Sequence, residues 1–293
     1  MYYPRGTTKK GIVKHNFHIK YEKTEIRETK GALSCQGSLF YYLRYHEKIS
    51  CFFKGMVIFY KIATMGALEE NIKNIWSRIE NAAEKTGKSK GDIKLVAVTK
   101  TVETERIKEA INRGIQIIGE NRVQEAESKF DQITEEVEKH LVGHLQTNKA
   151  KTAVELFDFI QSVDSQRIAQ EISRRASQMG KVMEVLVEIN TSGEETKFGI
   201  DPDEVLSFVK SISNLEGIKI KGLMTIGLFS DNPEDTRPCF KRLKAIFDQM
   251  KSECIPNVEM KYLSMGMTSD FEVAIQEGSN MVRVGTGIFG PRK

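Results

Sequence analysis

Lys94-Leu-Val-Ala-Val-Thr-Lys100 is the stretch of sequence that decides the fold. It is a short apolar run, which is typical of a buried strand. Its last residue is a lysine, so the strand would carry an amine to the rim of a sheet or barrel, where ligands bind in α/β proteins. We therefore expect Lys100 to lie at the centre of the functional site.

Helices and strands alternate on both sides of this run. A helix over residues 68–86 precedes it, with apolar residues at helical spacing on one face: Leu68, Ile72, Ile75, Ile79 and Ala82. Seven further strands are predicted over 115–119, 140–143, 159–163, 182–190, 218–226, 262–265 and 281–284. Helices are predicted between the strands over 103–113, 122–130, 148–156, 165–179, from Asp201-Pro202 onward, 233–254 and 270–277.

Eight strands alternating with helices match a single (β/α)8 TIM-like barrel, whose typical length of about 250 residues is close to the span covered here. A doubly wound open sheet is the main alternative, but the lack of an obvious second domain favours the barrel. Active sites of such barrels lie at the carboxyl ends of the strands. The polar residues that fall there are Lys100, Glu120-Asn121, His144, Asn190, Ser264 and Arg283.

The first 64 residues differ in composition from the rest. They hold 12 Lys/Arg against 4 Asp/Glu, a balance of +8, and seven of the eight tyrosines. Residues 65–293 hold 32 Lys/Arg and 36 Asp/Glu, a balance of −4. We expect an N-terminal extension over 1–64 that is poorly ordered or a translation-start artefact, and a barrel over 65–293. A basic, aromatic arm that touches a membrane or nucleic acid is the alternative for the extension.

Charge, hydropathy and cysteine usage exclude several classes of protein. The acidic body gives no support for nucleic-acid binding. The apolar stretch 51–60 is interrupted by Lys54, is shorter than the about 20 residues that span a bilayer, and lies too far from the N-terminus for an ordinary signal peptide. We therefore expect a cytoplasmic protein with no membrane or nucleic-acid partner. No C-x-x-C pair occurs among the four cysteines, Cys35, Cys51, Cys239 and Cys254.

Two glycine-rich segments near the C-terminus are suited to holding a phosphate. They are Leu263-Ser-Met-Gly-Met-Thr-Ser-Asp270 and Val282-Arg-Val-Gly-Thr-Gly-Ile-Phe-Gly290. They follow the last two strands, where barrels usually bind phosphate through backbone N–H groups and hydroxyls. An ordinary turn built from small residues is the alternative for each segment. With Lys100 opposite, the pair suggests a phosphorylated aldehyde held as an imine, since a partly desolvated lysine is a competent nucleophile.

Two further features allow more than one interpretation. Arg283 precedes the second glycine-rich loop and is open to three roles: a phosphate ligand, a structural ion pair, or a partner for a heterocycle nitrogen. His140 and His144 would lie on the same face of an extended strand, which raises a metal pair as an alternative. The H-E-x-x-H pattern is missing and no carboxylate cluster accompanies the histidines, so no metal site is predicted.

Six motifs, in order along the chain, resemble those of a known family. They are Lys94–Lys100, Ile118–Glu125, His140–Lys149, Gly222–Ile226, Leu263–Glu272 and Val282–Gly290. Together they resemble the pyridoxal phosphate homeostasis protein family, the YggS/PROSC group. The resemblance covers residues 65–292 without a gap, and the first 64 residues have no counterpart in it.

The resemblance implies a fold type III barrel like the N-terminal domain of alanine racemase, with pyridoxal 5′-phosphate (PLP) as cofactor. Lys100 is the residue that it implies for the internal aldimine. The other implied cofactor-binding residues are Ser264, Gly266, Gly285 and Thr286 at the phosphate, Arg283 at the pyridine nitrogen and Asn121 beside the cofactor.

The implied function is that of a carrier or regulator in intracellular PLP homeostasis, with no robust catalysis and no catalytic residue. Arginine can only donate a hydrogen bond, so the ring nitrogen would stay unprotonated and the cofactor would be a weaker electron sink. Racemases also use a tyrosine from a second domain, and Tyr262 is the only tyrosine after residue 64. A PLP-dependent enzyme such as an amino-acid racemase is the main alternative, followed by a sugar-phosphate aldolase and a pure interaction module. Expected partners are PLP and PLP-dependent apoenzymes, and we expect a monomer.

Overall fold

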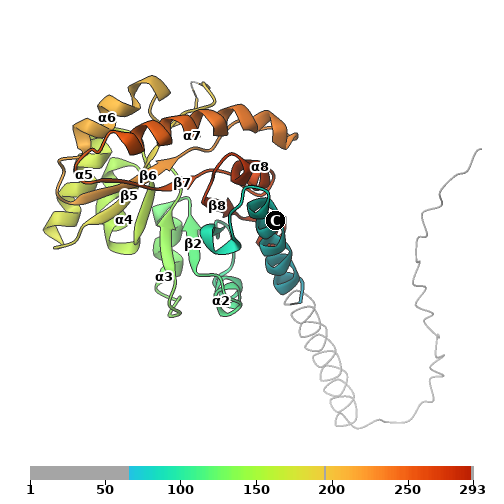
Figure 1. The fold of residues 1–293 in the computed structure, drawn as a ribbon. Coiled ribbons are helices and arrows are strands. Elements are labelled where there is room, and N and C mark those ends of the chain that lie inside the picture. The colour runs from blue at the N-terminus through green and yellow to red at the C-terminus, as the bar shows by residue number, and fades with distance from the viewer. Residues whose placement is uncertain (1–65, 195, 292–293) are drawn as a thin grey trace, which may run out of the picture. The chain divides into compact units, whose positions relative to one another are not determined.

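The computed structural model describes residues 66–194 and 196–291, which form a closed barrel of eight parallel strands arranged in chain order (Figure 1). Because β1 pairs with both β2 and β8, the sheet has no edge. The predicted single (β/α)8 barrel is therefore confirmed, and the open sheet is excluded. The strands are β1 Lys94–Val98, β2 Ile117–Glu120, β3 Glu138–Leu141, β4 Phe159–Val163, β5 Met183–Glu188, β6 Ile218–Met224, β7 Val258–Ser264 and β8 Met281–Val284.

Helices connect the strands and lie outside them, as Figure 1 shows for α3, α4, α5 and α7. A helix that includes residues 66–84 comes before β1. The others are α2 Thr104–Asn112, α3 Val123–Phe130, α4 Ala150–Leu156, α5 Gln166–Gln178, α6 Val205–Ile212, α7 Arg237–Ser252, α8 Phe271–Gln276 and α9 Thr286–Phe289. Short 3-10 helices are η1 Lys90–Asp92, η2 Thr147–Lys149, η3 Pro202–Glu204 and η4 Pro233–Thr236.

Two apolar clusters lie on the two faces of the strands. In β1, Leu95 and Ala97 belong to the large cluster between barrel and helices, whereas Val96 and Val98 belong to the smaller cluster inside the barrel. The alternation follows from the period of two along a strand. Burial on both faces explains why the strands are nearly continuous apolar runs. A polar residue inside such a strand therefore needs its own explanation.

Most strand boundaries lie within two residues of the sequence prediction, and three features of the observed elements need a physical reason. The first strand ends at Val98 and not at Lys100, because the backbone turns at Thr99, where the carbonyl accepts the Val102 N–H at 3.0 Å. β7 begins at Val258, four residues earlier than predicted, because exposed residues alternate with buried ones there and mask the apolar pattern. The short helix α9 was not predicted, since four residues are too few to show a helical period.

The predicted division between residues 64 and 65, and the structure of the N-terminal extension, lie outside the described residues, as do Cys35 and Cys51. Among the residues that the structure describes, no helix combines the length and the apolar character needed to cross a membrane.

Candidate functional site

Lys100 lies in a tight loop after β1 and not in the strand itself. The next residue, Thr101, has φ of 62°. A β-branched residue is seldom found in this left-handed region, and such strain persists only where the surroundings over-determine it. The Glu125 carboxylate holds the strained residue by accepting the Thr101 N–H.

A buried lysine secures the same loop from α3. Lys129 Nζ donates to the Thr99 carbonyl at 2.9 Å and pairs with Glu120 Oε1 at 3.0 Å and Glu125 Oε1 at 2.6 Å. Burial raises the pKa of Glu120, opposed by its hydrogen bond with Thr99 and by the Lys129 charge. The loop that carries Lys100 is thus tied to β2 and α3 by charged groups that little water reaches.

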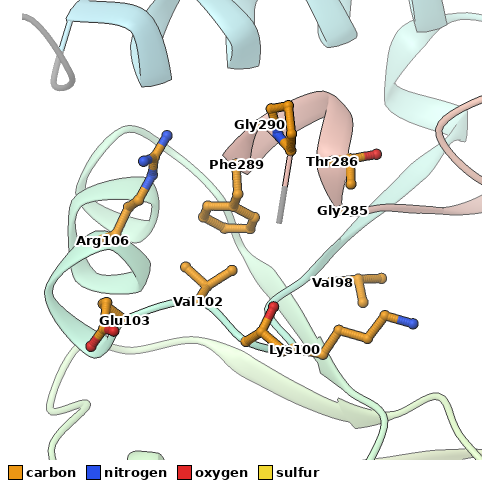
Figure 2. A pocket seen from close by; sticks show the side chains of 11 residues that line it. Val98, Lys100, Val102, Glu103, Arg106, Gly285, Thr286, Phe289 and Gly290 are labelled. Carbon is orange, nitrogen blue, oxygen red and sulfur yellow. The ribbon is translucent and has the colours of Figure 1, made fainter. Parts of the chain in front are cut away.

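Lys100 borders a cavity of about 240 Å³ between the β1 loop and the C-terminal segment. Figure 2 shows Lys100 and Val98 with Thr286 on one side of it, and Val102 and Arg106 on the other. Gly285 also lines the cavity. The structure therefore brings the predicted amine together with two of the predicted phosphate-binding residues.

A hydroxyl and two backbone amides meet at the start of α9. Thr268 Oγ1 accepts the N–H groups of Gly285 and Gly287, both at 3.3 Å. A Cβ at Gly287 would come within 3.0–3.1 Å of Ile75, Val284 and Thr268, so the position has almost no room for a side chain. We call these three groups, the Thr268 hydroxyl and the two N–H groups, the donor cluster. Thr268 belongs to the first glycine-rich segment but was not singled out from the sequence.

The guanidinium of Arg283 lies at the barrel mouth in a buried setting. Its Nη1 donates to Ser264 Oγ at 2.6 Å and its Nη2 to the Thr225 carbonyl at 2.7 Å. The Arg283 N–H donates to the carbonyl of Gly266, whose φ is 95°. Burial lowers the pKa of Arg283 to about 10, opposed by the charges of Glu188 and Asp270, so the group stays cationic at neutral pH.

Ser264 is fully buried at the end of β7, and its hydroxyl has partners on both sides. It accepts from Arg283 and donates to Gln161 Oε1 at 2.7 Å. The sequence pattern placed Ser264 at a phosphate, and the structure places its side chain against Arg283. Gln161 interrupts an apolar strand, and that polar residue was the signal that could have revealed it.

Asn121 lines a neighbouring hollow of the barrel mouth with Arg122, His144 and Lys149. A Cβ at Gly143 would lie 2.4 Å from the Asn121 carbonyl, so the β3 loop approaches Asn121 closely only because glycine is present. His144 is hydrogen-bonded to Asp164 at 2.6 Å and stacked on Phe198, with ring centroids 3.7 Å apart. Within residues 66–194 and 196–291, no group of three or more His, Cys, Asp and Glu side chains could hold a metal ion.

Glu188 ends β5 with 3% of its surface exposed, and its Oε2 is buried without a hydrogen-bond partner. It lines a cavity of about 140 Å³ with Thr225, Asn190 and Phe198. Burial raises the pKa of Glu188 to about 7, helped by Asp164 and opposed by Arg283. A charged residue at the end of an apolar strand was again the available signal.

Comparison with known proteins assigns the fold and the family. Residues 65–293 match the family model described as alanine racemase, N-terminal domain. The pyridoxal phosphate homeostasis protein of Aquifex aeolicus is 41% identical over 225 residues, covering 76% of this chain and 98% of that protein.

Solved structures agree. PipY of Synechococcus elongatus, in a structure with PLP bound, has a TM-score of 0.68 and 31% identity, covering 76% of this chain and all of that one. An alanine racemase of Clostridium difficile has a TM-score of 0.60 at 18% identity, over 76% of this chain and 56% of that one. The second likeness is one of fold alone.

Proposed function

This chain belongs to the pyridoxal phosphate homeostasis protein family, and from that premise we propose that it binds pyridoxal 5′-phosphate and takes part in PLP homeostasis as a carrier or regulator. One observation carries the proposal: Lys100, on a strained loop, lines the same cavity as Gly285 and Thr286. The PLP-bound PipY structure supports it from outside the chain.

The residues at the mouth fit the chemical groups of PLP. The cofactor supplies an aldehyde that reacts with a primary amine and an aromatic ring that withdraws electrons. Lys100 offers the amine, Arg283 offers a donor for the ring nitrogen, and the donor cluster at Thr268 offers groups suited to a phosphate. Cofactor-binding roles for Ser264, Gly266, Gly285, Thr286 and Asn121 are part of this proposal.

We further propose that the chain holds PLP without robust catalysis of its own. The Arg283 guanidinium can donate a hydrogen bond but cannot accept one, so the ring nitrogen beside it would stay unprotonated, which suits retention better than carbanion chemistry. PLP-dependent apoenzymes are the proposed recipients, and a cytoplasmic monomer is the proposed form. Turnover of a panel of L-amino acids that disappears in Lys100→Ala would favour the alternative, an amino-acid racemase.

Lys100→Ala tests the proposal directly. We expect the purified full-length protein to absorb visible light with bound PLP, and borohydride to attach PLP permanently to a peptide containing Lys100. The variant should lose both signals, because Lys100 is the only lysine among the described residues that line this cavity.

Lys108→Ala is the matched control, since Lys108 lies on α2 of the same β1–α2 unit, where it has a loose contact with Glu105 at 3.9 Å. It should keep both signals. A wild-type protein that shows no absorption band in the presence of PLP would contradict the proposed function.

A further inference from the structure

Six side chains form a continuous line of polar contacts through the barrel. Arg283 Nη1 contacts Ser264 Oγ at 2.6 Å, and Ser264 contacts Gln161 Oε1 at 2.7 Å. Beyond these, Gln161 Nε2 contacts His140 Nδ1 at 2.7 Å, His140 Nε2 contacts Glu138 Oε1 at 2.8 Å, and Lys94 Nζ contacts Glu138 Oε2 at 3.2 Å. We call this set the axial chain: Arg283, Ser264, Gln161, His140, Glu138 and Lys94.

The axial chain crosses the barrel from one end to the other. Arg283 and Ser264 lie near the carboxyl ends of β8 and β7, at the mouth. Glu138 and Lys94 are the first residues of β3 and β1, at the opposite end, and about a third of each side chain is exposed. Ser264, Gln161 and His140 between them are fully buried. Solvent at the far end is thus connected to the arginine of the proposed cofactor site.

Four hydrogen bonds of the axial chain run in one direction, from Arg283 to Glu138, and the fifth runs to Glu138 from Lys94 on its other side. A guanidinium can only donate, so Ser264 accepts from Arg283 and must pass its one proton to Gln161 Oε1. The Gln161 amide nitrogen then donates to His140 Nδ1, which leaves the imidazole proton on Nε2. Glu138 is ionised and can only accept, so it accepts one hydrogen bond from the His140 Nε2–H and another from Lys94 Nζ. If the Gln161 amide were rotated by 180°, its oxygen and nitrogen would exchange places, and the direction of the hydrogen bonds to Ser264 and His140 would be lost.

The order requires a neutral His140. A protonated ring would point a second N–H at the Gln161 amide nitrogen, donor against donor. Burial lowers the pKa of His140, opposed by its hydrogen bond to Glu138, and the ring is stacked on Phe159 with centroids 4.8 Å apart. The hydrogen bond from His140 and the charge of Lys94 hold the pKa of Glu138 down to about 2, so this end stays ionised at all physiological pH values.

We infer that the axial chain positions the Arg283 guanidinium for the cofactor, so that Gln161, His140 and Glu138 set PLP retention from inside and from the far end of the barrel. The inference rests on the proposed function. A fully satisfied buried network is rigid, and each member is held by the next. Loss of any member leaves a buried donor or acceptor without a hydrogen bond, which costs free energy. We expect the neighbouring side chains to move in response, and Arg283 to shift with them.

The test compares Glu138→Leu, Glu138→Gln and Gln161→Leu in the full-length protein. Leucine removes the acceptor at Glu138, whereas glutamine keeps an oxygen for the His140 proton. We expect the two leucine variants to bind PLP about ten-fold more weakly, from loss of one buried hydrogen bond, and Glu138→Gln to bind as the wild type does. In 15N spectra of histidine-labelled protein, His140 should be protonated on Nε2 alone in the wild type and in Glu138→Gln.

Ser279→Ala is the matched control for damage to the barrel. Ser279 is fully buried, and its hydroxyl lies within hydrogen-bond distance of the carbonyls of Leu263, Met265 and Met281, next to the axial chain but outside it. This variant should leave both the PLP affinity and the His140 spectrum unchanged.

Wild-type PLP affinity in both leucine variants, or a His140 proton on Nδ1 in the wild type, would overturn the inference while PLP binding itself stands. A wild type that binds no PLP would instead defeat the proposed function, a result that the absorption spectrum reports separately.

Discussion

Single residues at the barrel mouth have unusual ionisation because the apolar strands take water away from them. Arg283 keeps its charge there because it has two close hydrogen-bond acceptors. Glu188 has no hydrogen-bond partner for Oε2, and the charge of Arg283 offsets only part of the cost of its burial. Burial therefore affects the two side chains differently: Arg283 stays charged at neutral pH, whereas the pKa of Glu188 rises to about 7. The difference follows from their hydrogen-bond partners, which Arg283 has and Glu188 Oε2 lacks.

Glu188 should make the free energy of unfolding fall as pH rises from 4.5 to about 7. Its pKa is about 7 in the folded protein against 4.5 for the free side chain. Between these values the folded state holds a proton that the unfolded state has released, so the free energy of unfolding decreases with rising pH. At 1.36 kcal/mol per unit, the full effect is about 3 kcal/mol. Urea unfolding at pH 4 and pH 8 measures it.

Glu188→Gln is the control for this dependence, because the amide cannot ionise. Relative to the wild type, the variant should gain about 3 kcal/mol between pH 4 and pH 8. Parallel pH profiles for the two proteins would show that Glu188 does not titrate in this window.

At the scale of elements, loops and strand contacts place the site residues. The loop after β1 is secured by Lys129 from α3, and the β3 loop reaches Asn121 through Gly143. Seven of the eight strands were predicted to within two residues at both ends, including β4 and β8 without error. The loops could not be predicted in this way, because their shapes depend on side chains from other elements.

Lys129→Met should loosen the Lys100 loop and destabilise the protein. The change leaves Glu120 buried with no cation and frees the Thr99 carbonyl, a loss of about 3 kcal/mol for breaking a buried pair. Urea unfolding gives the stability, and the rate of PLP loss reports the loop. The double variant Glu120→Gln/Lys129→Met should recover part of the stability, because no buried charge is left. No recovery would show that the ion pair is not the cause.

Gly222→Ala should disrupt the contact between β6 and β7. Gly222 lies where the register between these strands shifts, has φ of 148°, and would place a Cβ 1.8 Å from the Tyr262 carbonyl oxygen. The backbones must separate, at a cost of about 4 kcal/mol or more in the free energy of unfolding. Gly180→Ala is the control: its φ is also positive, at 67°, but a Cβ would meet nothing within 4 Å. It should cost about 1 kcal/mol. Equal losses would argue against a clash at Gly222.

For the whole molecule, composition and family membership divide the chain at the same place. The acidic, amphipathic part begins at residue 65, as does the match to the family model. We predict that a chain beginning at Met65 unfolds cooperatively and binds PLP with the affinity of the full-length chain, since the barrel closes within these residues. Unfolding and PLP titration of both chains measure this. A weaker affinity in the shorter chain would give residues 1–64 a part in binding.

The native N-terminus decides between the two interpretations of the extension. Mass spectrometry of protein from native cells should find peptides starting at Met65 if the upstream residues are a translation-start artefact. Peptides from residues 1–64 would rule that out and support a real basic arm.

The sequence by itself determined the repeating order of strands and helices, the closed barrel, the family and the position of Lys100 near a strand end. These follow from local patterns, because apolar periodicity and glycine-rich turns are properties of neighbouring residues. The axial chain joins residues from β1, β3, β4, β7 and β8, and its contact between Gln161 and Ser264 spans 103 positions of sequence. Only barrel closure brings these residues together, so the setting of Arg283 was decided by tertiary structure.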